Sequence, residues 1–142
     1  MVVILDTDHL TVIQRRAEPA YSRLRARLSK SPPNAIQTTI IRFEEQMRGW
    51  LALISRVRNQ SREVVAYQRL QGLLRFFNEI PVLNYAEVAA ARYEDLRRLR
   101  LRVGSMDLKI ASIALSQDGL LLSGNLRDFQ KIPDLRVEDW TK

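Results

Sequence analysis

The sequence predicts an α/β fold in which a parallel sheet is covered by helices on both faces. Short apolar runs rich in branched residues alternate along the chain with longer segments of helical periodicity. Alternation at this spacing is typical of strand–helix–strand units. The 142 residues fit one domain, residues 1–142, and no repeat or linker divides them.

Strands are predicted where apolar runs are too short for helices. The first run, residues 2–5, stops abruptly at Asp6 and is typical of a buried strand. Further strands are expected at residues 35–40, 81–83, 120–122 and, at an edge, 135–137. We therefore expect a mostly parallel sheet of four to five strands.

Helices fill the segments between these strands. Asp8 is a candidate N-cap for a short helix after the first strand, and Ser105 for a later helix that ends near Gln117. The other helices are expected at residues 18–29, 43–57, 61–78 and 85–101. Residues 123–128 are expected to form a loop.

Composition excludes several kinds of protein. The chain has 23 Lys and Arg against 16 Asp and Glu, and this net charge of +7 favours a polyanionic partner. The absence of cysteine excludes a disulfide scaffold, a thiol nucleophile and a cysteine zinc site. The single histidine, His9, argues against a histidine zinc site or a Ser/His/Asp triad, and we expect it at the surface or in a cap. With no signal peptide and no membrane span, the sequence predicts a cytoplasmic protein.

Acidic residues follow the predicted strands. They lie just after a strand or in the first turn of a helix, at Asp6, Glu44, Glu45, Asp107 and Asp128. Ligands of open α/β sheets bind outside the carboxyl ends of the strands, so these carboxylates are expected to converge.

Each of these residues also has a purely structural interpretation. Asp6 and Asp8 are each candidates for capping the turn that follows, and periodicity alone does not select Glu45 over Glu44. Asp107 lies on an apolar helix face, where a carboxylate is costly unless it is paired or bound to metal. Its alternative role is to interact with the helix dipole. No single carboxylate therefore indicates a site, whereas the whole set does.

Converging carboxylates predict a site for Mg²⁺ or Mn²⁺, which prefer oxygen ligands. Such an ion lowers the pKa of a bound water and stabilises the charge that develops on a phosphodiester. Together with the arginine-rich composition, this chemistry predicts hydrolysis of nucleic acid.

Four segments resemble the motifs of PIN domains, in order and over nearly the whole chain. VVILDTDHL resembles the entry strand with its Asp-Thr-Asn/Asp sequence, and TTIIRFEEQMRG resembles the second motif, a glutamate four residues before a glycine. GSMDLKIASIAL is similar to the third motif, an aspartate before an alanine-rich helix. LLLSGNLRDFQKIPDLRVEDW resembles the closing segment.

The subfamily that the chain resembles most is VapC, the toxin of bacterial type II toxin–antitoxin pairs. The resemblance implies a PIN-like three-layer sandwich and a Mg²⁺- or Mn²⁺-dependent endoribonuclease. It also implies an RNA substrate, a cognate antitoxin and a homodimer, with no membrane partner.

The resemblance also assigns site residues. It selects Glu45 by its spacing from Gly49, and implies Asp6, Glu45 and Asp107 as catalytic metal ligands. It implies Asp128 as a fourth catalytic carboxylate, with Asn125 as the other candidate for completing the acidic site. Asp8, Ser123 and Asn125 are weaker candidates for contacts to substrate or to the ligands.

Two residues depart from the family pattern. Ser123 replaces the usual threonine and keeps the hydroxyl group. Arg42 replaces a common threonine before the glutamate, which we expect to alter substrate contacts.

Two other functions remain open. One is a basic module that binds nucleic acid or a partner without catalysis. The other is a haloacid-dehalogenase-like phosphatase with Asp6 as nucleophile and Asp8 as general acid. Leu10 stands where that phosphatase family has threonine, and no paired aspartates follow a later strand.

Overall fold

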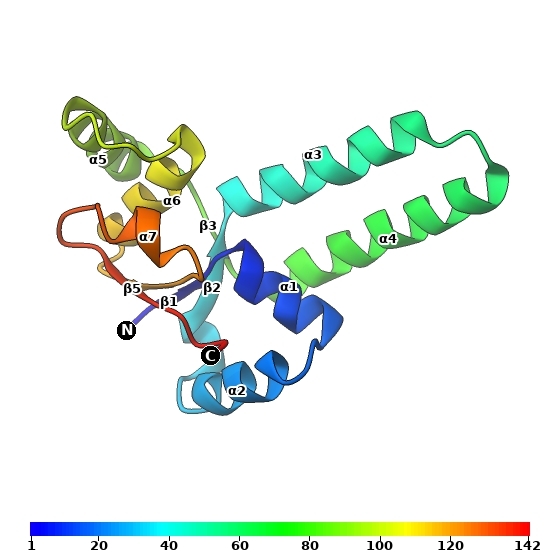
Figure 1. Ribbon diagram of the computed structural model, residues 1–142, viewed down its shortest axis with the longest axis horizontal. Helices are drawn as coiled ribbons and strands as arrows, with labels where there is room; N and C mark the ends of the chain where they lie inside the picture. The colour runs from blue at the N-terminus through cyan, green and yellow to red at the C-terminus, as the bar shows by residue number, and fades with distance from the viewer.

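The computed structural model describes residues 1–142 and has a five-stranded sheet at its centre (Figure 1). The strands lie in the order β3-β2-β1-β4-β5, and every neighbouring pair is parallel. Their bounds are β1 Val3–Leu5, β2 Ile36–Thr39, β3 Val82–Leu83, β4 Leu120–Leu122 and β5 Arg136–Glu138. The predicted fold class is confirmed, with a sheet that is wholly parallel.

Seven helices surround the sheet, together with a 3₁₀ turn at Pro33–Ala35. They are α1 Thr7–Arg15, α2 Ala20–Leu28, α3 Ile40–Arg56, α4 Gln60–Glu79, α5 Glu87–Arg98, α6 Ser105–Ser116 and α7 Leu126–Phe129. In Figure 1 the long helices α3 and α4 run side by side as a hairpin that projects away from the sheet. None of the helices is both long and apolar enough to cross a bilayer.

Side-chain alternation along the strands explains the three layers. In β1, Val3 and Leu5 point into one apolar cluster, whereas Ile4 points into the other. The first cluster joins the sheet to α1, α2 and α4 and the second joins it to α5 and α6. Because successive side chains of a strand point to opposite faces, one wholly apolar strand serves both cores.

Three local predictions were wrong. The N-cap position of α1 is held by Asp6 instead of Asp8, since the chain passes directly from β1 into the helix. Ser105 is the first residue of α6, and Gly104 takes the N-cap position. The expected loop at residues 123–128 contains the start of the short helix α7.

The prediction that His9 lies at the surface or in a cap was also wrong, because its side chain is fully buried. Its Nδ1 lies 2.8 Å from Oδ1 of Asp8, and its Nε2 accepts a hydrogen bond of 3.0 Å from the backbone N–H of Trp140. His9 therefore connects the first turn of α1 to the segment after β5.

We predict that His9→Ala lowers the free energy of unfolding by about 2 kcal/mol or more, because the buried N–H of Trp140 loses its acceptor. Urea unfolding followed by circular dichroism measures the change. Gln14→Ala is a control in the same helix that removes an exposed hydrogen bond to Gln46, and it should change the unfolding free energy by less than about 0.5 kcal/mol. Equal stabilities of the two variants would contradict the role of His9.

Candidate active site

The sheet order determines where the acidic residues meet. From β1 the chain moves to β2 and β3 on one side, and later to β4 and β5 on the other. The carboxyl end of β1 is therefore the switch point, where open α/β sheets bind their ligands. Asp6 follows β1 at this point, and its backbone N–H donates to the carbonyl of Leu122 at the end of β4.

Three of the predicted carboxylates surround the side chain of Arg42. The guanidinium donates from Nε to Asp6, from Nη1 to Oε2 of Glu45 at 2.6 Å, and from Nη2 to Oδ1 of Asp107 at 2.9 Å. These residues come from the end of β1, the first turns of α3 and the first turn of α6. We call Asp6, Arg42, Glu45 and Asp107 the acidic centre.

The α3 helix places Arg42 and Glu45 on the same side. The hydroxyl of Thr39, the last residue of β2, accepts a hydrogen bond of 3.3 Å from the backbone N–H of Arg42 and so caps the helix. Residues three apart lie on one helix face, which brings Arg42 and Glu45 to the same edge of the sheet.

Burial differs within the acidic centre. The side chains of Asp6 and Arg42 are only 6% and 9% exposed, whereas Glu45 and Asp107 keep 30% and 22% of their side-chain surface exposed. Burial alone would lower the pKa of Arg42, but the charges of Asp6 and Glu45 and their hydrogen bonds raise it above its ordinary value. The guanidinium therefore stays charged.

Hydrogen bonds from the β4–α7 segment complete the surroundings. The Ser123 hydroxyl donates to Oδ2 of Asp6 at 2.7 Å. The Asn125 amide donates to Oδ2 of Asp107 at 3.5 Å and to Oδ2 of Asp128 at 3.3 Å. Hydrogen bonds from Asn125 and Lys131 lower the pKa of Asp128. Asn125 and Asp128 thus both lie at the margin of the acidic centre, while their catalytic roles stay predictions.

Asp8 has different partners from the other predicted site residues. Its carboxylate accepts hydrogen bonds from His9 and from the backbone N–H of Gly124. A Cβ atom on Gly124 would lie 2.5 Å from Oδ2 of Asp8, so a larger residue there would require the Asp8 side chain to move. Partial burial opposes ionisation of Asp8, but the hydrogen bonds from His9 and Gly124 outweigh it and lower the pKa.

Arg42 is the residue whose position the sequence analysis missed. A basic residue at the start of an amphipathic helix is usually a surface charge or a substrate contact. The available signal was its place three residues before Glu45 and next to Ile41, which is itself buried. A charged residue beside the buried face of the helix requires partners of opposite sign.

The acidic centre has only part of what a divalent ion requires. Its carboxylates are the ligand type that Mg²⁺ and Mn²⁺ prefer. However, no group of three or more acidic or histidine side chains is arranged to hold a metal ion, and the guanidinium binds an oxygen from each of the three carboxylates. With Arg42 in this position, the residues do not fit a metal ion.

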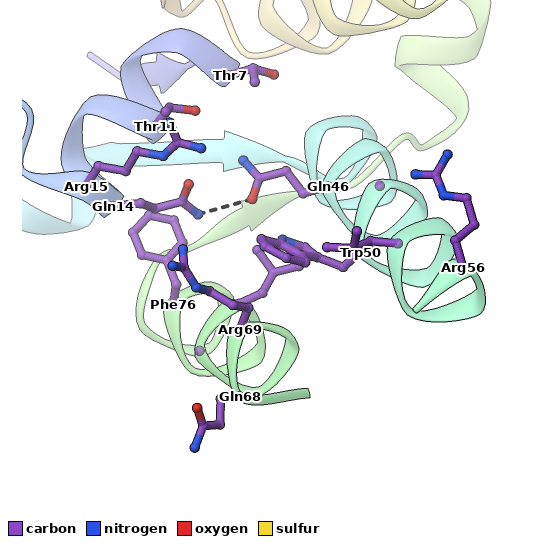
Figure 2. A pocket seen from close by; sticks show the side chains of 14 residues that line it. Thr7, Thr11, Gln14, Arg15, Gln46, Trp50, Arg56, Gln68, Arg69 and Phe76 are labelled. Atoms are coloured by element: carbon purple, nitrogen blue, oxygen red, sulfur yellow. Dashed lines mark hydrogen bonds between the residues drawn. The ribbon is translucent and has the colours of Figure 1, made fainter. Parts of the chain in front are cut away.

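A separate groove of about 750 Å³ lies between α1 and the α3–α4 hairpin (Figure 2). Trp50 and Phe76 contribute apolar surface, and three arginines line the groove, Arg15, Arg56 and Arg69. Its lining contains no acidic residue. Thr7, next to Asp6 in the chain, also lines it, and its buried hydroxyl has no hydrogen-bond partner.

Comparison with curated proteins extends over the full chain. Ribonuclease VapC1 of Haemophilus influenzae and Ribonuclease VapC2 of Rickettsia felis are each 28% identical over 143 residues, covering all of this chain and all of the relative. A tRNA(fMet)-specific endonuclease VapC of Salmonella typhimurium is 36% identical over 69 residues, 46% of this chain and 52% of the relative. No family model matches the chain.

Solved structures agree with this comparison. VapBC-1 from nontypeable Haemophilus influenzae matches with 26% identity and a TM-score of 0.76, over 100% of both chains. The resemblance to the VapC ribonucleases is confirmed. VapBC2 from Rickettsia felis, solved with a DNA fragment from its promoter, shares the fold of this VapC-like chain at 23% identity, with a TM-score of 0.75 over 99% of both chains.

We predict that Asp8→Asn makes unfolding less sensitive to acid. A carboxyl group whose pKa is lowered by folding stabilises the native state above the pKa of the unfolded chain, about 4, and this contribution is lost as the pH falls through the folded-state pKa. The variant should be less stable than the original protein at pH 7. Below about pH 4 its stability should fall less steeply than that of the original protein.

Urea midpoints between pH 7 and pH 2.5 measure this dependence. Asp95→Asn is the control, because Asp95 is 72% exposed on α5. If the urea midpoint falls by the same amount between pH 7 and pH 2.5 in the Asp8 variant and in the original protein, the Asp8 hydrogen bonds do not stabilise the fold.

Proposed function

We propose that this chain is an endoribonuclease that acts as the toxin of a type II toxin–antitoxin pair. The observation that carries the proposal is the convergence of Asp6, Glu45 and Asp107 at the sheet's switch point. It is supported by whole-length similarity to proteins named Ribonuclease VapC. The bacterial relatives favour a cytoplasmic location, where RNA is available.

The partly exposed carboxylates are suited to proton transfer. Glu45 and Asp107 each place one oxygen on Arg42 and keep surface in contact with solvent. An ionised carboxylate there can accept a proton from a water that attacks a phosphodiester. Asp6, held by Ser123 and Arg42, is buried and fixes the arrangement of the other groups.

The net negative charge of the acidic centre indicates that an RNA phosphate needs an added cation in order to bind there. Three carboxylates and one guanidinium leave two net negative charges in the acidic centre, and Asp128 lies nearby. An RNA phosphate would be repelled by this charge unless a cation accompanies it. We therefore propose that cleavage depends on Mg²⁺ or Mn²⁺, for which the guanidinium would have to move.

The groove is the proposed binding surface for an antitoxin. VapBC complexes are among the solved structures of similar fold. A groove that combines apolar side chains with three arginines and has no acidic lining favours a segment that carries both apolar and acidic side chains. Gly49 and Gly72 line it, and a Cβ atom at either would contact nothing within 4 Å, so the groove has free space there.

We also propose a homodimer, which light scattering of the purified protein tests.

The two alternative functions have weaker support. A phosphatase general acid must hold a proton near neutral pH, whereas hydrogen bonds lower the pKa of Asp8. A purely binding module does not require three carboxylates to converge around a buried cation.

We predict that purified protein cleaves a mixed RNA pool in Mg²⁺ or Mn²⁺ and not in EDTA. Asp6→Asn and Asp107→Asn should each lower the cleavage rate by about 100-fold or more, because each removes a charge from the reacting centre. Gel electrophoresis of end-labelled RNA measures the rate, and circular dichroism verifies folding.

Asp95→Asn is the matched control, since it removes one exposed carboxylate on α5 that pairs with Arg98 outside the acidic centre. It should cleave like the original protein. RNA binding without cleavage, unchanged by Asp6→Asn, would support the binding module instead.

We predict that Arg69→Glu weakens binding of the antitoxin by about tenfold or more, because it places a negative charge in the groove. The probe is a synthetic peptide with apolar and acidic side chains that stands in for the antitoxin segment, and calorimetry measures its affinity. Arg92→Glu makes the same change on an exposed face of α5 and should have a small effect. An equal loss in both variants would indicate nonspecific charge attraction.

A further inference from the structure

The guanidinium of Arg42 occupies the position between the three carboxylates. It contacts Oδ1 of Asp6, Oε2 of Glu45 and Oδ1 of Asp107, one oxygen on each partner. These are carboxylate oxygens that a hard divalent ion would require as ligands. The guanidinium and an ion cannot both use them.

Arg42 is also well anchored. Its side chain is 9% exposed, and Thr39 caps the helix at its backbone N–H. The other partner of Asp6 is a neutral hydroxyl, that of Ser123, so Arg42 provides the positive charge in contact with this buried carboxylate. Removing it without replacement would leave the buried carboxylate of Asp6 and the partly exposed ones of Glu45 and Asp107 to repel one another.

Arginine cannot leave the acidic centre by losing its proton. Its charge persists over the whole physiological pH range, and the surrounding carboxylates raise its pKa further. A lysine could be displaced by deprotonation, but Arg42 must rotate out of the centre with its charge intact. An incoming ion therefore has to replace hydrogen bonds to all three carboxylates.

We infer that Arg42 is a resident cation that competes with divalent metal for the acidic centre and thereby sets the metal concentration at which the site fills. At low concentrations of metal, the guanidinium holds the three carboxylates together and occupies the oxygens that an ion would need. This inference deepens the proposed function and rests on it only in treating the acidic centre as the reaction site.

Metal binding is measured directly, apart from any cleavage, by Mn²⁺ titration with electron paramagnetic resonance. Arg42→Ser restores a hydroxyl residue and should bind Mn²⁺ at least about tenfold more tightly than the original protein. The variant should also gain more in melting temperature from added Mn²⁺, since the ion then neutralises the carboxylates. Equal Mn²⁺ affinity in the two proteins overturns the inference.

Arg48→Ser is the matched control for net charge. Arg48 lies in the same helix, is 72% exposed and pairs with Glu44 outside the acidic centre. It should bind Mn²⁺ with the affinity of the original protein. A gain in Mn²⁺ affinity as large as that of Arg42→Ser would show that overall charge, not competition for the carboxylates, controls the ion.

A measurement on the unaltered protein keeps the inference testable if Arg42→Ser does not fold. The Nε–H resonance of Arg42 is followed by NMR during a Mg²⁺ titration, with Arg42→Lys used for assignment. The inference predicts that this resonance shifts or disappears in parallel with Mg²⁺ binding at Asp107, or that no Mg²⁺ binds there. Saturation of Asp107 by Mg²⁺ with an unchanged Arg42 resonance overturns it. None of these measurements uses RNA. If the original protein does not cleave RNA, the proposed function is overturned, but the inference that Arg42 competes with metal is not.

Discussion

Repulsion among three carboxylates at one edge of a parallel sheet is the central constraint on this structure. Asp6, Glu45 and Asp107 come from segments far apart in the sequence, and the strand order brings them together. A single guanidinium, that of Arg42, joins all three. Buried charges require compensating partners, and the guanidinium of Arg42 compensates the carboxylates where they meet.

The rest of the fold supports this arrangement in two ways. Apolar side chains on both faces of β1 and β4 hold the strand ends next to each other, and Ser123 then reaches Asp6 across the β1–β4 pair. Thr39 caps the start of α3 at the end of β2, so the first turns of this helix place both Arg42 and Glu45 at the carboxyl edge of the sheet. The reaction site that we propose is therefore a product of the strand order and of one helix cap.

The sequence was sufficient to predict the layers and part of the site. Short apolar runs bounded by turn residues indicated the strands, and acidic residues after them indicated the edge at which they meet. Periodicity alone did not select Glu45, because Glu44 lies nearer the apolar edge of the helix and Glu45 nearer its basic face. The family resemblance selected Glu45. In the structure Glu45 contacts Arg42, whereas Glu44 pairs with the exposed Arg48.

Two buried polar residues escaped prediction for the same reason. His9 and Arg42 are residue types that usually lie at surfaces, and the partners that allow their burial come from distant parts of the chain, Trp140 for His9 and Asp107 for Arg42. A local pattern can indicate that such a residue needs partners, but not which distant residues provide them. The start of α1 was misplaced because Asp8, a good capping residue, is instead engaged by His9 and Gly124.

The most direct test is the anomalous diffraction of Mn²⁺ in crystals of Arg42→Ser. We expect one Mn²⁺ site ligated by oxygens of Asp6, Glu45 and Asp107, in the position that the guanidinium occupies in the unaltered protein. Crystals saturated with Mn²⁺ that show no ion between these three carboxylates would contradict the assignment of this edge as the reaction centre.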